Sequence, residues 1–149
     1  MKYRTRKAVP ADETRIRELF LEMLRTIYSS EDVEGYQDGD LDRFWIDEDN
    51  QIYVAEDREV IAFLSIEVHH DQDDYIYLDD FSVTEAYRNQ GVGSALIRTA
   101  ESFAGEINIS RICLHVEKTN LDALRFYENK GYLVYRDDGH RFLMKKDLI

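Results

Sequence analysis

The sequence predicts one α/β domain over residues 1–149, built on a mixed sheet. Two segments carry this prediction. In the first, residues 75–83 have the composition of a strand, and a glycine loop leads from them into an amphipathic helix. In the second, the apolar run 111–116 predicts a buried strand, and residues 119–130 predict a helix that Gly131 ends. With 44% apolar residues, the chain can bury a sizeable core.

Two helices are expected after a first strand over residues 3–8. The longer one begins at Pro10 or Ala11 and ends at Tyr28, since proline suits a first helical turn. Residues 29–40 are acidic and predict a loop, and residues 41–46 predict a short second helix. The apolar stripe of the long helix recurs at helical spacing: Ile16, Leu19, Phe20, Met23, Leu24 and Ile27.

The remaining elements follow from strand patterns and turn residues. Residues 51–55 and 60–69 predict a hairpin about residues 56–59, and residues 132–136 and 141–145 predict a second hairpin with its turn at 137–140. The expected order is therefore βααβββαβαββ. The helix after the glycine loop packs through apolar residues at three- and four-residue steps: Val92, Ala95, Leu96, Ala100 and Phe103.

The glycine loop before that helix is a candidate anion site. Gly91 and Gly93 let the backbone approach a ligand closely. The first amide groups of a helix lack partners within it, and the helix dipole favours negative charge there. The alternative is ordinary turn chemistry. The loop lacks the lysine of a P-loop and the third glycine of a dinucleotide fingerprint.

The helix over residues 119–130 places Asn120 and Tyr127 on one face, because they lie seven residues apart. Thr119 with Asp122 suggests a capping-box-like start. From spacing alone, the pattern favours Tyr127 as a packing tyrosine of an amphipathic helix.

Taken together, these segments resemble the GCN5-related N-acetyltransferase (GNAT) superfamily, most clearly over residues 53–135. The family signature Gln/Arg-x-x-Gly-x-Gly/Ala is matched by Arg88, Gly91 and Gly93, and a family-like run covers residues 120–132. Residues 78–83 resemble the corresponding segment of diamine and aminoglycoside acetyltransferases. The resemblance implies a GNAT fold, with the central sheet splayed between the fourth and fifth strands. It also implies acetyl-CoA as cosubstrate and coenzyme A as product.

The same resemblance implies where acetyl-CoA is held. Backbone groups of Phe81, Ser82 and Val83 would hold the pantetheine arm and direct an N–H to the thioester carbonyl. Asn120 would contact that arm or fix the start of its helix. Arg88 adds charge, or is simply solvated. Main-chain amides over residues 88–94 would hold the diphosphate: Arg88, Asn89, Gln90, Gly91, Val92, Gly93 and Ser94.

Catalysis requires a proton acceptor, because an alkylamine has a pKa near 10.4 and attacks only when neutral. Asp79 and Asp80 are the leading candidates, and Asp79 is favoured by the diamine-acetylating resemblance. Adjacent side chains on a regular strand point to opposite faces, so only one would face the substrate unless a bulge intervenes. Glu117 is a third choice. Tyr127 stands at the family's tyrosine position and would protonate the departing thiolate, with direct transfer in a ternary complex.

Charge narrows the acceptor. A net charge of −12 disfavours nucleic acid as a partner. Acidic segments would concentrate a cationic amine such as a polyamine or aminoglycoside, although acidic loops also serve solubility. Residues expected to line the acceptor pocket are Glu31, Tyr36, Trp45 and Glu117.

Other function classes are disfavoured. One cysteine excludes an internal disulfide, and no His/Cys cluster has the spacing of a metal site. The four histidines have no evident partners in the sequence, and His115 is expected to be a core residue with satisfied nitrogens. Neither a signal peptide nor a membrane-length apolar run is visible, which predicts a cytoplasmic protein with no membrane partner. A homodimer is possible but not required.

Three functions remain open from the sequence. The first is an N-acetyltransferase for a small cationic amine. The second is an acetyltransferase for a protein lysine or N-terminal amine, which would need an open groove. The third is a non-catalytic acyl-CoA sensor on the same fold.

Overall fold

The computed structural model describes residues 2–148 and contains a seven-stranded mixed sheet in the order β1-β2-β3-β4-β5-β7-β6. The strands are β1 (Arg4–Lys7), β2 (Gln51–Asp57), β3 (Glu59–His70), β4 (Asp74–Val83), β5 (Arg111–Glu117), β6 (Leu133–Asp137) and β7 (Arg141–Asp147). The helices are α1 (Glu13–Tyr28), α2 (Asp42–Ile46), α3 (Val92–Glu106) and α4 (Leu121–Asn129). Short 3-10 turns cover Pro10–Asp12 and Glu85–Tyr87. The predicted α/β class and element order are confirmed.

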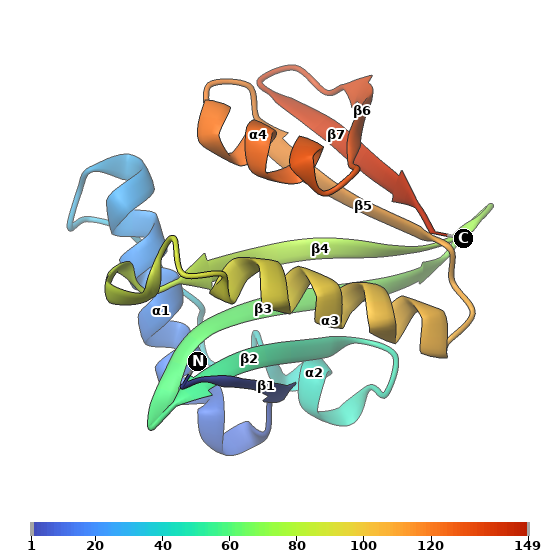
Figure 1. The fold of residues 1–149 in the computed structure, drawn as a ribbon. Coiled ribbons are helices and arrows are strands. Elements are labelled where there is room, and N and C mark those ends of the chain that lie inside the picture. Colours follow the sequence, from blue (N-terminus) through green and yellow to red (C-terminus); the bar gives the residue numbers. More distant parts are fainter. Residues whose placement is uncertain (1, 149) are drawn as a thin grey trace.

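Two apolar cores hold the helices on opposite faces of the sheet. The helix α3 crosses one face and buries Leu96, Ile97 and Ala100 against the strands (Figure 1). On the other face, α1 and α2 bury a second cluster that includes Ile16 and Leu19. The burial of these stripes is the main stabilising term, at roughly 1.5–3 kcal/mol for each large side chain. The helices α1 and α3 therefore have fixed positions on the two faces beside β4.

The parallel pair β4–β5 is joined over only a short stretch. Its register runs from Ile76↔Ile112 to Leu78↔Leu114. Beyond Leu78 the two strands separate, as Figure 1 shows where β5 rises away from β4. Five residues of β4 and three of β5 continue past the last pair. The splay between the fourth and fifth strands is therefore present, and it opens the sheet between α1 and α3.

A β-bulge changes the direction of the acidic pair in β4. Leu64 is opposite Phe81 and Ile66 is opposite Leu78, so Asp79 and Asp80 together face the single residue Ser65. Because Leu78 and Phe81 both lie on the α3 face, the two aspartates lie on the other face, beside α1. The regular alternation considered from the sequence does not apply here.

Two boundaries differ from the sequence predictions. The β2–β3 hairpin turns at Arg58 alone, which has φ 67°, so the strands extend into the predicted tip at 56–59. The helix α4 begins after Asn120, whose side chain accepts from the amide of Ala123 at 3.2 Å. The predicted cap by Thr119 is therefore wrong. Asparagine caps as well as threonine does, and local sequence does not choose between neighbours.

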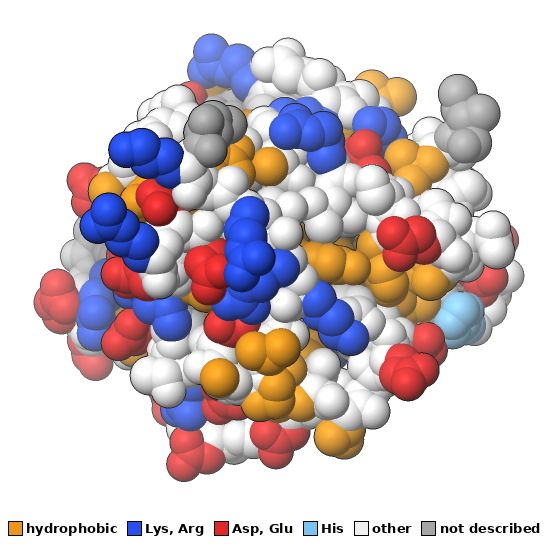
Figure 2. All heavy atoms as spheres, turned by 60° about the horizontal axis from the view of Figure 1, so that its bottom comes forward, with side chains coloured by type: hydrophobic (Ala, Val, Ile, Leu, Met, Phe, Trp, Pro, Cys, Tyr) orange, Lys and Arg blue, Asp and Glu red, His pale blue; other side chains and the backbone are white. Residues whose placement is uncertain are grey.

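The surface mixes charges of both signs in spite of the net charge of −12. Figure 2 shows Lys and Arg side chains among Asp and Glu side chains on the face that lies at the bottom of Figure 1. Of the helices within residues 2–148, none is both long and apolar enough to cross a membrane. The edge strand β6 is exposed at all five positions.

Candidate active site

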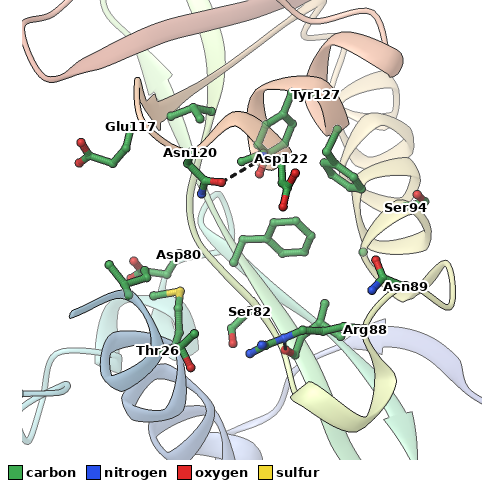
Figure 3. Close-up of a pocket in the computed structure, with 18 of the residues that line it drawn as sticks. Thr26, Asp80, Ser82, Arg88, Asn89, Ser94, Glu117, Asn120, Asp122 and Tyr127 are labelled. Carbon is green, nitrogen blue, oxygen red and sulfur yellow. Dashed lines mark hydrogen bonds between the residues drawn. The ribbon is translucent and has the colours of Figure 1, made fainter. Parts of the chain in front are cut away.

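A cleft of about 800 Å³ opens where β4 and β5 separate. Figure 3 shows its two ends: Asn89 and Ser94 lie on the α3 side, and Asp80 and Glu117 lie on the opposite side. Asn120 and Tyr127 lie above the strands. Among the sequence-predicted residues, the lining includes Asp79, Asp80, Phe81, Ser82, Val83, Arg88, Asn89, Gly91, Gly93, Ser94, Glu117, Asn120 and Tyr127.

The start of α3 presents unused amide groups to this cleft. Gly91 is the N-cap residue with φ 84°, a backbone conformation that favours glycine. The first intrahelical bond is from the amide of Ala95 to the carbonyl of Gly91 at 3.0 Å. The N–H groups of Val92, Gly93 and Ser94 precede it and have no partner within the helix. These donors, together with the helix dipole, make an anion site.

Gly93 is needed for space rather than for its backbone angles. A Cβ atom at this position would lie 3.1 Å from Cζ of Phe81. The Phe81 ring also packs against Phe126, with ring centroids 6.3 Å apart. The glycine therefore lets α3 approach the aromatic floor of the cleft.

The loop before α3 is tied to β4 and α1. Arg88 donates through Nε to the carbonyl of Val83 at 2.9 Å and through Nη2 to Glu22 at 3.3 Å. Glu22 also accepts from the hydroxyl of Thr84 at 2.8 Å and from the amide of Glu85 at 3.1 Å. Glu22 was missed by sequence reasoning, because nothing in a helical glutamate indicates a loop 62 residues away.

Two residues of the predicted diphosphate loop do not line the cleft. Gln90 donates through Nε2 to the carbonyl of Ala86 at 3.0 Å, and the side chain of Val92 is buried in the core. The prediction for Gln90 and Val92 was that their main-chain amides would hold the diphosphate. The positions of their side chains leave those main-chain groups available.

The backbone of β4 supplies further donors. The amide of Thr84 bonds to Ile61 of β3 at 2.9 Å. Because backbone groups alternate along a strand, the N–H groups of Phe81 and Val83 face the separated β5 side. The Ser82 side chain points away, since its hydroxyl donates to the carbonyl of Leu19 at 3.3 Å. The contribution of Ser82 is therefore limited to its main chain.

Asp79 and Asp80 have different surroundings at the other end of the cleft. Asp80 accepts a hydrogen bond from the hydroxyl of Tyr36, whose ring stacks on Phe20 with centroids 4.0 Å apart. Asp79 has no hydrogen-bond partner for its carboxylate within residues 2–148. Asp79 is accessible at the mouth of the cleft, yet partial desolvation of its carboxylate, and then the nearby charge of Asp80, raise its pKa to about 6. Burial also raises the pKa of Asp80 above its usual value.

Tyr127 faces the cleft from α4. Its ring packs edge-on against Phe126 and Tyr132, with centroids 5.1 and 5.8 Å away. Burial raises the pKa of its phenol, so the hydroxyl stays protonated at neutral pH. No partner for this hydroxyl is found in the described part of the chain. A protonated, unpaired hydroxyl in a cleft can donate a proton.

His115 is a cleft residue that sequence reasoning placed in the core. Its Nδ1 lies 2.6 Å from the hydroxyl of Tyr77, and its Nε2 lies 2.8 Å from Oδ2 of Asp138. Its nitrogens are satisfied, as expected, but the expectation that it lacks partners of a triad type is wrong. No local pattern indicates this contact, because Asp138 lies 23 residues away in a turn.

The other predicted acceptor residues are dispersed. Glu117 lines the cleft and pairs with His140 at 2.8 Å. Tyr36 reaches the cleft region only through Asp80. Glu31 pairs with Arg25 in solvent, and Trp45 donates to Glu13 at 3.0 Å beside the second core. Within residues 2–148, no group of three or more metal-ligating side chains is present.

The residues present fit a thioester of coenzyme A. The free amides of α3 suit a diphosphate, and Gly93 removes the side chain that would fill the adjacent space. The separated strands leave the amides of Phe81 and Val83 available to an extended, amide-bearing arm.

Comparison with known proteins places this chain in a family. Residues 18–132 match the family model described as "Acetyltransferase (GNAT) family". Streptothricin acetyltransferase A of Bacillus subtilis (strain 168) is 25% identical over 99 residues, which cover 66% of this chain and 57% of that protein. The match therefore spans little more than half of that relative.

Solved structures agree with this placement. The PaiA N-acetyltransferase of Thermoplasma acidophilum, in complex with coenzyme A, has a TM-score of 0.82 at 20% identity, covering 99% of both chains. Arabidopsis thaliana NAA60, in complex with a bisubstrate analogue, has a TM-score of 0.76 at 18% identity, covering 98% of both. At these identities the likeness concerns the fold. The family match over residues 18–132 shows that the chain belongs to the GNAT acetyltransferase family.

Proposed function

We propose that this chain is an acetyl-CoA-dependent N-acetyltransferase that acts on a primary amine of a small, cationic acceptor by direct transfer in a ternary complex. One observation carries the proposal. The cleft between β4 and β5 joins free amides at the start of α3 to an unpaired carboxylate, Asp79, at its other end.

Holding the cosubstrate is assigned to main-chain groups. The amides of Val92, Gly93 and Ser94 would bind the diphosphate, and Arg88 would fix the preceding loop through Val83. The side chain of Asn120 caps α4, which positions that helix above the cleft. When bound, acetyl-CoA supplies the activated acetyl group. An N–H of Phe81 or Val83 that donates to its carbonyl could contribute about 2.7–4 kcal/mol to the transition state.

Two groups on the α1 face of β4 can accept the proton of the amine. Asp79 is the first, and its charge also attracts an ammonium group. Tyr77 is the second: it lies two residues earlier on the same face, and its hydroxyl contacts Nδ1 of His115, which lines the cleft. Asp80 is held by Tyr36 and would act mainly through its charge.

Kinetic measurements distinguish a group that accepts the proton from a group that only attracts the ammonium. Losing the proton acceptor lowers kcat, whereas losing a group that only attracts the ammonium raises KM for the amine. Asp79→Asn and Tyr77→Phe, each measured at saturating acetyl-CoA, therefore distinguish the two assignments.

Tyr127 is proposed as the general acid. Tyr127 lines the cleft, burial raises the pKa of its phenol and keeps it protonated, and its hydroxyl has no hydrogen-bond partner within residues 2–148. Its proton would pass to the sulfur of the departing coenzyme A. The structure supplies no other unpaired hydroxyl on the α4 side of the cleft among the described lining residues.

A cationic acceptor follows from the charges at the amine end. Asp79, Asp80 and Glu117 all line that end, and no arginine or lysine pairs with any of them within residues 2–148. Arg43 and Arg141 act on Asp79 only from a distance, and the pKa of Asp79 stays raised in spite of them. A cationic ligand in contact with these carboxylates would therefore relieve their repulsion. The similarity to streptothricin acetyltransferase A supports an acceptor of this kind.

A protein N-terminal amine is the second candidate acceptor. Asp79 and Glu117 are exposed at the mouth of the cleft, so this end is open enough for a peptide. The fold likeness to NAA60 is compatible with this alternative.

The test is turnover on an amine panel, followed by the release of free thiol from acetyl-CoA. Spermidine, kanamycin and streptothricin represent cationic acceptors, and peptides with free N termini represent the alternative. The proposal would be supported if the cationic amines are acetylated and if Tyr127→Phe slows this turnover. Turnover on peptides alone would favour the second candidate. Acetyl-CoA binding by calorimetry without turnover on any amine would indicate a sensor and refute the enzyme assignment.

A further inference from the structure

The hydrogen-bond chain through His115 contains a residue that the function proposed above does not explain. Asp138 lies in the turn between β6 and β7, yet its carboxylate reaches a histidine of the cleft wall on β5. Tyr77, on β4, contacts the other nitrogen of that histidine at 2.6 Å. Three separate elements of the fold thus meet at one imidazole.

The contacts of Asp138 determine which nitrogen of His115 carries the proton. Its Oδ1 accepts from Nε of Arg136 at 2.6 Å, and its Oδ2 lies 3.1 Å from Nη2 of Arg136. The Arg136 guanidinium, followed by His115, holds the pKa of Asp138 well below its usual range. The group is therefore a carboxylate at neutral pH and can only accept. Nε2 of His115 must then be the donor across the 2.8 Å contact.

The opposite nitrogen is left as an acceptor. In a neutral imidazole with its proton on Nε2, Nδ1 carries a lone pair. The hydroxyl of Tyr77 can donate to this lone pair. It stays protonated because burial, and then the charge of Asp79, raise the pKa of Tyr77 to about 12. Asp138 therefore sets the direction of both hydrogen bonds that His115 makes.

We propose that Asp138 is a positioning residue, which keeps the proton on Nε2 of His115 so that Nδ1 can take the hydroxyl proton of Tyr77. This inference rests on the proposed function for its catalytic consequence. A proton of the attacking amine would move to the Tyr77 oxygen, while the Tyr77 proton moves to Nδ1. The imidazolium that forms would be stabilised by the Asp138 carboxylate and would later release one proton to water.

The turn is built to hold Asp138 in place. The amide of Asp138 bonds to the carbonyl of Arg141 at 2.9 Å, and Gly139 follows with φ 90°. The amide of Lys118 bonds to the carbonyl of His140 at 3.0 Å, which ties the turn to the end of β5. A carboxylate fixed from both sides orients its partner at little entropic cost when the reaction occurs.

The neighbouring residue provides a matched control. Asp137 lies in the same hairpin but pairs with Lys118 at 2.7 Å and accepts from the amide of Gly139 at 3.0 Å. Asp137→Asn therefore makes the same chemical change without touching His115.

The decisive variant is Asp138→Asn. An asparagine has a single oxygen, and Arg136 donates to both carboxylate oxygens of the wild-type residue. We expect the oxygen to stay with Arg136 and the NH₂ group to donate to Nε2 of His115, which moves the imidazole proton to Nδ1. Nitrogen-15 NMR of labelled histidine reads this directly: protonated Nε2 in the wild type and in Asp137→Asn, and protonated Nδ1 in Asp138→Asn.

Kinetics supply the second readout. With Nδ1 protonated, Tyr77 has no acceptor, so kcat for the amine should fall by about 100-fold or more in Asp138→Asn. KM for acetyl-CoA should not change, because the diphosphate site is at the other end of the cleft. Asp138→Ala, which removes the acceptor without supplying a donor, should give a mixture of both tautomers and an intermediate kcat.

The outcomes are distinct. An unchanged Nε2 tautomer in Asp138→Asn would overturn the proposal, and so would a switched tautomer with unchanged kcat. A loss of folding in Asp138→Asn, seen as a lost NMR dispersion, would leave Asp138→Ala to decide by the same criteria. If the wild type turned over no amine, the proposed function would fail, while the tautomer measurement would still confirm or overturn the hold of Asp138 on His115.

Discussion

Replacing Gly91 by aspartate, and in a matched variant by asparagine, isolates the charge requirement of the proposed diphosphate site. Gly91 is the N-cap residue of α3 with φ 84°, and the unused amides of Val92, Gly93 and Ser94 follow it. Aspartate and asparagine have nearly the same shape, and both tolerate positive φ better than other side chains do. Both can also accept from the free amides as cap residues and so compete with a phosphate. The two variants differ only in one negative charge.

The expected difference follows from Coulomb interaction. A carboxylate about 6 Å from a phosphate charge costs about 0.7 kcal/mol at the dielectric constant of water and about 2.8 kcal/mol at an effective value near 20. Acetyl-CoA should therefore bind roughly 3- to 100-fold more weakly to Gly91→Asp than to Gly91→Asn. The difference in acetyl-CoA affinity between the two variants should decrease as salt is added, because screening weakens the interaction between exposed charges.

Calorimetric titration with acetyl-CoA at low and high salt measures this difference. Thermal unfolding of the two variants serves as the control. Their free energies of unfolding should fall by a similar amount, about 1–2 kcal/mol, because each places a side chain in the left-handed backbone region. Equal affinities of the two variants for acetyl-CoA, at equal stability, would refute the diphosphate site at the start of α3.

Four further predictions concern Tyr127, Asp79 and Glu22. Tyr127→Phe should lower kcat by about 100-fold or more while acetyl-CoA affinity stays the same, measured by thiol release and calorimetry; equal losses in binding would indicate a packing role. Activity on a cationic amine should fall as the pH drops through about 6, because Asp79 then gains a proton and loses its charge, and Asp79→Asn should abolish this limb of the pH profile. Since the folded-state pKa of Asp79 is raised, its ionisation destabilises the fold as pH rises toward 6, so Asp79→Asn should also increase Tm at pH 7 and not at pH 4. Glu22→Ala removes the acceptor for Thr84, Glu85 and Arg88, and should weaken acetyl-CoA binding by about tenfold through the loosened loop, with unchanged affinity contradicting that link.

The local sequence predicted the elements well because each has its own signal. The stripe that contains Ile16 and Leu19 identified α1, and the start of α3 followed from Gly91 and the apolar steps after it. Gly131 ends α4 with φ 93°, as its position after the last turn predicted. Such signals depend on neighbours within a few positions along the chain.

Boundaries and side-chain directions in β4 depended on its partner strand. The bulge opposite Ser65 turns Asp79 and Asp80 to one face, and only the register with β3 reveals it. In the same way, Asn120 rather than Thr119 caps α4, a choice between neighbouring capping residues that the local sequence does not make.

The sequence by itself determined the family, the element order and the main-chain groups proposed to bind acetyl-CoA, since these follow from glycines and periodicity within short segments. The tertiary structure alone decided the partners of the polar side chains. Glu22 meets Arg88, Tyr36 meets Asp80, and Asp138 meets His115 across distant parts of the chain. The physical reason is that a hydrogen bond needs two groups within about 3 Å, and separation along the sequence says little about separation in space.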